Sequence, residues 1–183
     1  MTIDIPGYRA GTWVLDPAHS EVTFSVRHMM ISKVRGSFGI KSATLVAPEN
    51  PLEASVTASV DVTSIDTNDE GRDTHLRSAD FFDVENFPTI EFVSTGTRVE
   101  KGEFLVDGDL TIRGVSKPVT FEFDFGGFGA DPWGNYKAGA SATTVINRED
   151  FGLTWNAALE TGGVLVGKDI TINLDLQGSL QQD

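Results

Sequence analysis

The sequence contains no cysteine among its 183 residues. It therefore cannot form disulfides, present a thiolate nucleophile, or bind zinc or an iron–sulfur cluster through cysteine. Histidine is also scarce, with only His19, His28 and His75. No two of them stand at HxH or HExxH spacing, so the sequence gives no support to a zinc site. We expect neither a metal ion nor a cofactor.

Positive charge is in short supply, because 14 Lys and Arg residues face 27 Asp and Glu residues, a net charge of −13. A chain of this sign repels phosphate backbones and anionic membrane surfaces, so neither nucleic acid nor stable membrane insertion is expected. Long apolar runs are also missing, and none approaches the ~18 residues of a membrane span. Residues 1–9 carry neither the basic nor the apolar part of a signal peptide, which predicts a cytoplasmic protein.

The sequence is rich in strict alternation of apolar and polar residues. Such alternation is typical of antiparallel strands with one buried and one exposed face, whereas parallel sheets show continuous apolar runs. About eight or nine segments of this kind, separated by turn residues, predict one all-β domain. The clearest alternating segments are residues 21–28, 55–62, 119–125 and 170–177.

Two segments depart from this alternation. Residues 67–78 predict one short helix, with Thr67 or Asn68 as its cap and Arg77 in its last turn. The Gly-rich residues 126–135 lack the glycine spacing of a nucleotide-binding loop. We interpret them as a mobile loop at a hairpin end, in a position to cover the mouth of a barrel.

Small residues raise the question of whether the predicted barrel is hollow. Ala138, Ala140 and Ala142 fall on one face of one strand, and Gly108 lies among larger apolar residues. Small inward-facing residues leave space in which a barrel of about eight strands holds one ligand. The alternatives are that these residues accommodate Phe rings or a bulge, or that the interior is filled and the protein acts through its surface.

A few polar side chains are candidates for contact with the head group of a ligand. Arg72 and His75 lie three residues apart and would share one side of the helix, and His28 ends an inward-facing row. These groups would hydrogen-bond a polar or anionic head group. The alternative for Arg72 is a network with Asp73 that ties the helix to the barrel rim. We expect Arg148 to pair with a carboxylate on the helical segment, in a structural role.

Several blocks of the sequence, in the same order, resemble the YceI-like family. The resemblance runs from about residue 12 to residue 178 and implies an extended, lipocalin-like antiparallel barrel that holds a long isoprenoid or similar amphiphile in its tunnel. The family's motifs define no catalytic set, so we assign no catalytic residue. The blocks are residues 13–20 (WVLDPAHS), 22–28 (VTFSVRH), 36–38 (GSF), 64–67 (SIDT), 72–76 (RDTHL), 80–84 (DFFDV), 87–88 (FP), 110–119 (LTIRGVSKPV) and 147–153 (NREDFGL).

We therefore predict an all-β, extended antiparallel lipocalin-like β-barrel of about eight strands with one short helix. It spans residues 12–180 and follows an N-terminal arm of residues 1–11. The predicted function is non-catalytic binding of a polyisoprenoid, an isoprenoid quinone or a fatty-chain ligand in the tunnel, for transport, storage or sensing. The residues expected to bind the ligand are Phe24, Val26, Phe92, Phe104, Val106, Leu110, Phe121, Phe123 and Ile172, with His28, Arg72 and His75 near its head group.

One alternative function and the oligomeric state stay open at this point. The alternative is an enzyme that acts on a small ligand in the same cavity, with His28 as general acid or base. A homodimer formed through a strand edge or a barrel flank is compatible with the sequence, but no sequence feature fixes it.

Overall fold

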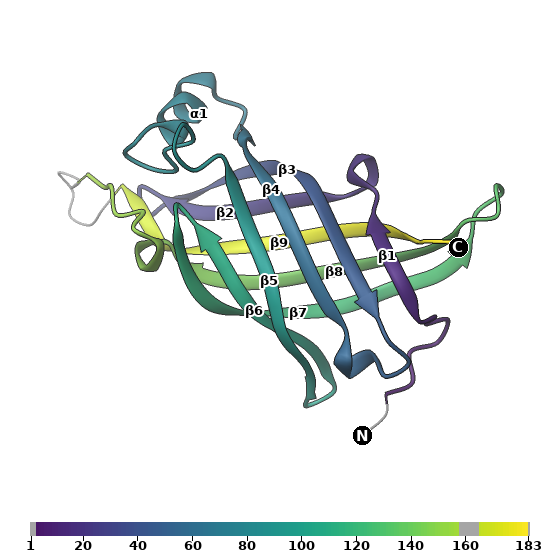
Figure 1. Ribbon diagram of the computed structural model, residues 1–183. Coiled ribbons are helices and arrows are strands. Elements are labelled where there is room, and N and C mark those ends of the chain that lie inside the picture. The colour runs from purple at the N-terminus through teal and green to yellow at the C-terminus, as the bar shows by residue number, and fades with distance from the viewer. Residues whose placement is uncertain (1–2, 158–164, 183) are drawn as a thin grey trace.

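The computed structural model describes residues 3–157 and 165–182, and within them it contains nine β-strands and one α-helix (Figure 1). The strands are β1 (Gly11–Leu15), β2 (Glu21–His28), β3 (Ser32–Ala47), β4 (Ser55–Asp66), β5 (Thr89–Glu100), β6 (Glu103–Ile112), β7 (Val115–Ala130), β8 (Tyr136–Asn147) and β9 (Val166–Leu180). The helices are α1 (Glu70–Arg77) and the 3-10 helices η1 (Pro17–His19), η2 (Pro51–Glu53) and η3 (Arg148–Phe151).

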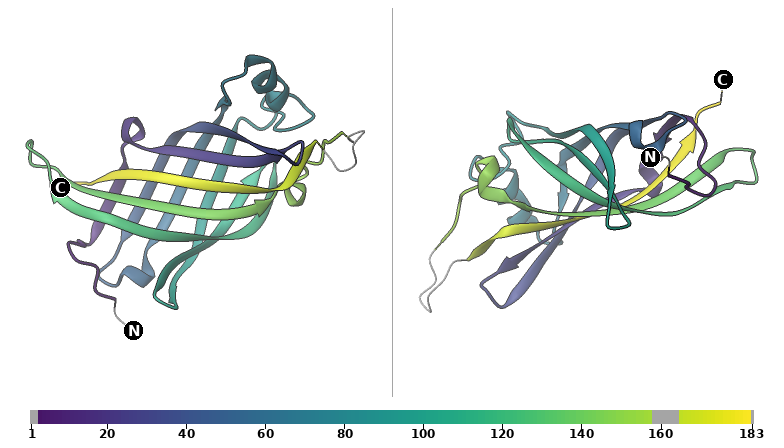
Figure 2. Two further views of the ribbon diagram at one scale, coloured as in Figure 1. Left: turned by 180° about the vertical axis from the view of Figure 1, so that it is seen from behind. Right: turned by 90° about the horizontal axis from the view of Figure 1, so that it is seen from below.

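The strands close into one antiparallel barrel (Figure 1 and Figure 2). Strands β2 to β9 pair in sequence order, and β9 pairs back to β2. Strand β1 pairs with β3 and β9, the same two neighbours that flank β2. β1 and β2 therefore share one strand position, interrupted by η1. The barrel thus has eight strand positions, which confirms the predicted fold class.

Tight turns set the register of two consecutive hairpins. Lys101 and Gly102 join β5 to β6 with φ values of 53° and 82°, and Arg113 and Gly114 join β6 to β7 with 51° and 73°. Two consecutive residues in the left-handed region make the turn that matches the twist of antiparallel strands, and glycine adopts this region without steric cost.

Half of the Gly-rich segment 126–135 is strand, so its prediction as a loop is wrong for residues 126–130 and right for residues 131–135. β7 continues through Gly126 and Gly129 to Ala130, and only residues 131–135 form the turn into β8. Gly127 has a φ of 139°, and the pairing register with β8 shifts between Phe125 and Gly127. The glycines therefore accommodate a β-bulge within a long hairpin.

The predicted helix is present as α1, but its cap is a different residue. Asp69 is the N-cap, and its Oδ1 accepts a hydrogen bond from the Arg72 amide at 3.0 Å. Thr67 precedes the helix, and its hydroxyl bonds the Asp73 side chain instead. The sequence offers several capping side chains in a row, and contacts with the barrel rim decide among them.

The molecule has two ends, and α1 and the N-terminal residues lie at opposite ones (Figure 2). We call them the helix end and the arm end. The most deeply buried large side chains, Val62, Ile65 and Phe151, belong to β4 and η3 where these elements reach the helix end. Part of the packed core therefore lies at the helix end.

Candidate ligand-binding cavity

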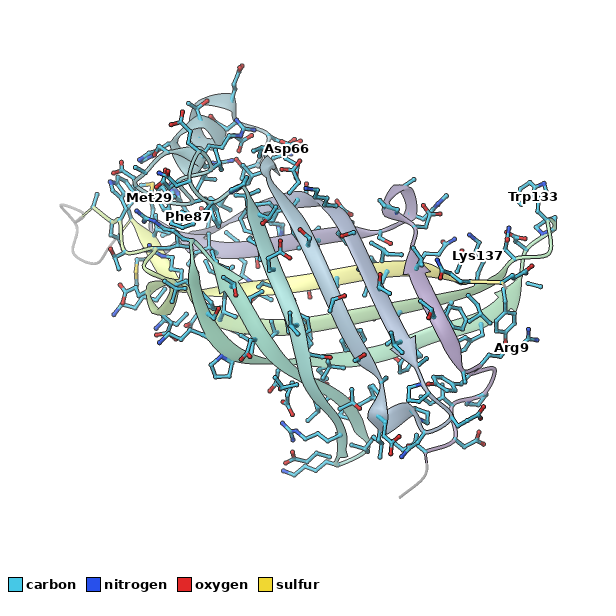
Figure 3. The ribbon with its side chains drawn as sticks, viewed as in Figure 1. Arg9, Met29, Asp66, Phe87, Trp133 and Lys137 are labelled. Atoms are coloured by element: carbon cyan, nitrogen blue, oxygen red, sulfur yellow. The ribbon has the colours of Figure 1, made fainter. Side chains whose placement is uncertain are left out.

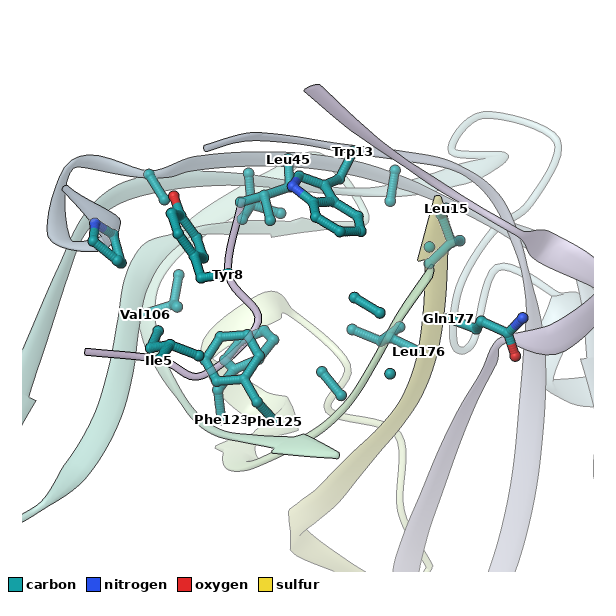
Figure 4. Close-up of a pocket in the computed structure, with 18 of the residues that line it drawn as sticks. Ile5, Tyr8, Trp13, Leu15, Leu45, Val106, Phe123, Phe125, Leu176 and Gln177 are labelled. Atoms are coloured by element: carbon teal, nitrogen blue, oxygen red, sulfur yellow. The ribbon is translucent and has the colours of Figure 1, made fainter. Parts of the chain in front are cut away.

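The barrel interior contains two adjoining apolar chambers. The helix chamber, with a volume of about 210 Å³, lies beneath α1. The arm chamber, with a volume of about 150 Å³, lies beneath the N-terminal residues (Figure 4). Both chambers are lined by Leu15, Ala43, Val56, Phe123 and Leu176. These shared side chains place the two chambers next to each other, and the lining of both forms an apolar tract along the inside of the barrel.

Inward-facing positions of the alternating strands supply most of this lining. Successive side chains of a strand point to opposite faces, so every second residue of β2, β7 and β9 reaches the interior. All nine apolar residues predicted to bind the ligand line a chamber, which confirms their inward position and leaves ligand binding itself as a proposal. Phe24, Val26, Phe92, Leu110, Phe121 and Ile172 line the helix chamber, Phe104 and Val106 line the arm chamber, and Phe123 lines both.

The small residues of the barrel have two different roles. Ala138 and Ala140 line the arm chamber, where their short side chains leave space. Gly108 has the other role, because a Cβ at this position would lie 2.4 Å from the Cζ of Phe92. The space beside Gly108 is therefore occupied by an aromatic ring, as the alternative interpretation predicted.

The Arg72 side chain forms hydrogen bonds with the barrel rim. Its Nε donates to the Thr67 hydroxyl at 2.8 Å, and its Nη2 donates to the Thr67 carbonyl at 2.6 Å. The same hydroxyl and the Thr67 amide bond the buried Asp73 carboxylate, at 2.5 and 2.9 Å. This is the network between helix and rim that the sequence left as an alternative, and Arg72 is not among the residues that line either chamber.

The two candidate histidines also stand outside the lining of both chambers. His75 Nε2 lies 2.9 Å from Asp80 Oδ2, and its ring packs edge-on against Phe81 and Trp155. His28 ends β2, where it pairs with Ser32 of β3. A role for these residues at a head group stays a prediction, and within the described residues the enzyme alternative has no histidine lining the cavity.

Arg148 is the one charged side chain among the described lining residues. The sequence interpretation gave it a structural role but did not predict that it lines the cavity. It is only 3% exposed, and burial lowers the pKa of its guanidinium. The expected carboxylate partner on the helical segment is wrong, because backbone carbonyls take up the donors and compensate the buried charge. These carbonyls belong to Gly167, Leu153, Trp155 and Val166, at 2.7, 2.5, 3.0 and 3.3 Å.

The N-terminal arm closes the other end. Ile5 and Tyr8 line the arm chamber (Figure 4). The Tyr8 hydroxyl donates to the Pro48 carbonyl at 2.6 Å, and the Tyr136 hydroxyl donates to the Gly7 carbonyl at 2.7 Å. Burial raises the pKa of Tyr8, which keeps its hydroxyl protonated as a donor. The sequence marked this segment as an arm but gave no sign that it lines a cavity.

A closed antiparallel barrel around an apolar cavity is the architecture of the lipocalin-like barrels. None of the helices that the structure describes is long and apolar enough to cross a membrane. The family model for the YceI-like domain matches residues 13–178, and the chain belongs to this family. The resemblance noted in the sequence is therefore confirmed.

Relatives and solved structures agree with this assignment. The chain is 38% identical over 172 residues to the UPF0312 protein SAS2572 of Staphylococcus aureus, covering 93% of this chain and 98% of that protein. BcnA of Burkholderia cenocepacia superposes with a TM-score of 0.76 at 23% identity, over 89% of this chain and 98% of BcnA. A polyisoprenoid-binding domain from Saccharophagus degradans gives a TM-score of 0.68 at 13% identity, over 92% and 98% of the two chains. These two structures share the fold.

Proposed function

We propose that the protein binds one long apolar chain, such as a polyisoprenoid or an isoprenoid quinone, inside the barrel. The observation that carries this proposal is the apolar tract that the two adjoining chambers line. Each Å² of tail that leaves water contributes ~25 cal/mol. A tract that is already formed avoids much of the ordering cost of binding. The Saccharophagus degradans domain, which has the same fold, is described as polyisoprenoid binding and supports this ligand class.

The length of the tract favours an elongated ligand over a compact one. Val166 of β9 lines the helix chamber, and Gly178 of the same strand lines the arm chamber. At ~3.3 Å per residue they are ~40 Å apart along the strand. A strand tilt of ~40° makes this ~30 Å along the barrel axis. A compact ligand would occupy one chamber and leave the other empty.

The chemistry of the lining favours a neutral head group. Arg148 is the charged residue among the described lining residues, and four backbone carbonyls already accept its hydrogen bonds. An anionic head group would have to be desolvated without a free cation opposite it, which is costly. A quinone or another neutral head group does not carry this cost. We propose transport, storage or sensing of such a molecule as the role of binding.

Filling either chamber tests whether one ligand spans both. We expect Ala140→Phe in the arm chamber and Ala58→Phe in the helix chamber each to weaken binding of a long polyprenol at least about tenfold, or ~1.4 kcal/mol. Binding of the short analogue farnesol should be weakened by only one of them. The measurement is displacement of a fluorescent fatty chain from the purified protein.

Matched outward substitutions on the same two strands control for folding. Ser141→Phe on β8 and Thr57→Phe on β4 add the same ring on the exposed face and should leave affinity unchanged. Mass spectrometry of lipid extracted from protein purified from its native host identifies the natural ligand. Full retention of polyprenol affinity in both inward variants would refute binding inside the barrel.

A further inference from the structure

The turn between β2 and β3 presents an exposed apolar surface. Met29, Met30 and Ile31 follow one another at this turn and are 44%, 55% and 81% exposed. We call these three residues the apolar tip. Figure 3 places Met29 at the opposite end of the barrel from the exposed Trp133. Three consecutive large apolar side chains in water indicate a contact with something apolar.

The backbone of the apolar tip does not explain its sequence. Met29 and Met30 have φ values of 55° and 63°, and the Ile31 amide bonds the His28 carbonyl at 3.3 Å. This is the same left-handed turn that Lys101–Gly102 and Arg113–Gly114 make, but there the second position is glycine. Residues with side chains rarely adopt this conformation. The two methionines therefore occupy the turn at the expense of its backbone, which favours a role for their side chains.

Positive charge flanks the apolar tip. Arg27 of β2 and Lys33 and Arg35 of β3 are all exposed, and Arg27 pairs with Lys33 in the strand register. We call these three residues the basic flank. From residue 22 to residue 48 the sequence has no Asp or Glu, although 27 of its 183 residues are acidic. The hairpin therefore differs sharply in charge from the rest of the chain.

Among the described residues, two acids of the neighbouring strands lie far from the apolar tip along their strands, and on the β9 side Asp169 and Glu149 share one cation, Lys168. Glu21 begins β2 and lies eight residues from Met29, ~26 Å along the strand. Asp66 of β4 pairs with Ser37, six residues from Ile31 and ~20 Å along β3. On the adjacent strand β9, Asp169 follows Lys168, and the Lys168 Nζ lies 3.7 Å from Glu149.

Salt screening limits the distance over which acidic residues influence the apolar tip. The Debye length at physiological ionic strength is ~8 Å. Charges beyond ~20 Å are therefore screened from a surface that touches the apolar tip. The net charge of −13 repels anionic surfaces from the molecule as a whole, but the hairpin meets such a surface with its own positive charge.

We propose that the β2–β3 hairpin docks on an anionic lipid bilayer. The apolar tip enters the interface between head groups and acyl chains, and the basic flank contacts the anionic head groups. The charge of the flank selects a negatively charged bilayer over other apolar partners. The contact is peripheral and reversible, because one turn of chain enters the interface.

Docking at this hairpin also orients the cavity. Val26 of the same strand lines the helix chamber, and the Met29 amide bonds the Leu165 carbonyl at 2.7 Å, next to the lining residue Val166. A docked hairpin holds this rim of the chamber against the bilayer. That consequence rests on the proposed function, whereas docking itself rests only on the hairpin.

Vesicle sedimentation with ligand-free protein tests the docking. We expect binding to vesicles that contain phosphatidylglycerol, weaker binding to pure phosphatidylcholine, and a loss of binding as salt rises. The double variant Met29→Asn, Met30→Gly should bind about tenfold more weakly. It should also resist urea better than the wild type, because its turn is favourable. The triple variant Arg27→Gln, Lys33→Gln, Arg35→Gln should lose the preference for anionic vesicles.

Matched variants away from the apolar tip and the basic flank serve as controls. Lys41→Gln, Lys101→Gln, Lys117→Gln removes the same charge, and Trp133→Gly removes an exposed apolar residue at the arm end; both should bind vesicles within about twofold of the wild type. The proposal is overturned if the Met29 and Met30 variant binds vesicles normally, if Trp133→Gly abolishes binding, or if the apolar tip mediates only a dimer. Polyprenol affinity is measured separately in the same variants and should not change, so the failure of docking and the failure of ligand binding are distinguishable.

Discussion

The two ends of the barrel are closed by different chemistry. At the helix end, arginine side chains donate to backbone carbonyls of neighbouring segments. Arg77 bonds the carbonyls of Thr63 and Ile65 at 3.1 and 3.0 Å, Arg113 bonds those of Ala79 and Gly152 at 2.8 and 3.3 Å, and Arg148 bonds four. At the arm end, a short segment lies across the opening and is held by two tyrosine hydroxyls and apolar contacts.

Because of this difference, the helix end forms a fixed wall of the cavity and the arm end forms a detachable one. Each of these three arginines bonds segments that contribute to the packed core, so opening the helix end would disturb the core. Ile5 and Tyr8 at the arm end contact the barrel without belonging to its sheet. The arm end should therefore open at a smaller cost in free energy than the helix end.

Removing Arg148 should have the largest effect on stability. Arg148→Met removes a donor from four carbonyls, of which the Val166 carbonyl keeps its bond from Asn156 Nδ2 at 2.7 Å. An unsatisfied buried group costs ~1–3 kcal/mol. We expect the free energy of unfolding to fall by at least ~3 kcal/mol, measured by urea denaturation. Arg148→Lys keeps the charge but not the planar set of donors. Its free energy of unfolding should therefore lie between those of the wild type and Arg148→Met.

The exposed neighbour Lys168 provides the matched control. Lys168→Met removes a cation from the same region and should change stability by less than ~0.5 kcal/mol, because its ion pair with Glu149 is exposed. Equal losses in the two variants would contradict the fixed wall at the helix end.

The inner wall of the barrel was predictable because alternation is a local property of the sequence. Phe24 and Val26 of β2 and Phe121 and Phe123 of β7 stand at every second position, and a pleated strand sends such residues to one side. Strand closure then brings those sides together. The fold class and the apolar lining therefore follow from residue spacing.

The ends of the barrel were less predictable because their contacts join distant segments. Arg72 and Arg148 are both arginines near an element boundary, and their sequence neighbours do not indicate that one bonds Thr67 while the other lines the cavity. The position of Tyr8 over the arm chamber likewise depends on its bond to Pro48, 40 residues away. Such hydrogen-bond partners are fixed by tertiary packing.

Loosening the arm should have a smaller effect on stability and a larger effect on access to the cavity. The double variant Ile5→Ser, Tyr8→Ser removes two half-buried side chains and one hydrogen bond, for an expected loss of ~1–2 kcal/mol. Trp13 is 5% exposed, and its Nε1 donates to the Arg9 carbonyl beside this segment. Quenching of Trp13 fluorescence by acrylamide should rise.

A protein with a single tryptophan makes the fluorescence measurement specific for Trp13. The variant background Trp133→Phe, Trp155→Phe leaves Trp13 as the one tryptophan of the chain. Asp4→Ser changes an exposed residue of the same arm and should leave quenching as it was. Unchanged quenching in the Ile5 and Tyr8 variant would count against a detachable arm.

The smallest expected effect is a pH dependence at the arm end. Asp131 accepts the amides of Asn135 and Trp133, both at 2.9 Å, and these bonds hold its pKa below the ordinary value. Because the folded pKa is lowered, this contribution to stability is present above the unfolded pKa and is lost as pH falls through the folded pKa. Asp131→Asn mimics the protonated carboxyl, so its melting temperature should be slightly lower than that of the wild type at pH 7 and equal to it in strong acid. The control is Arg148→Lys, whose loss of melting temperature should persist across the same pH range, because backbone carbonyls do not titrate. If the loss of melting temperature in Asp131→Asn stays constant in acid, the charge of Asp131 does not stabilise the turn.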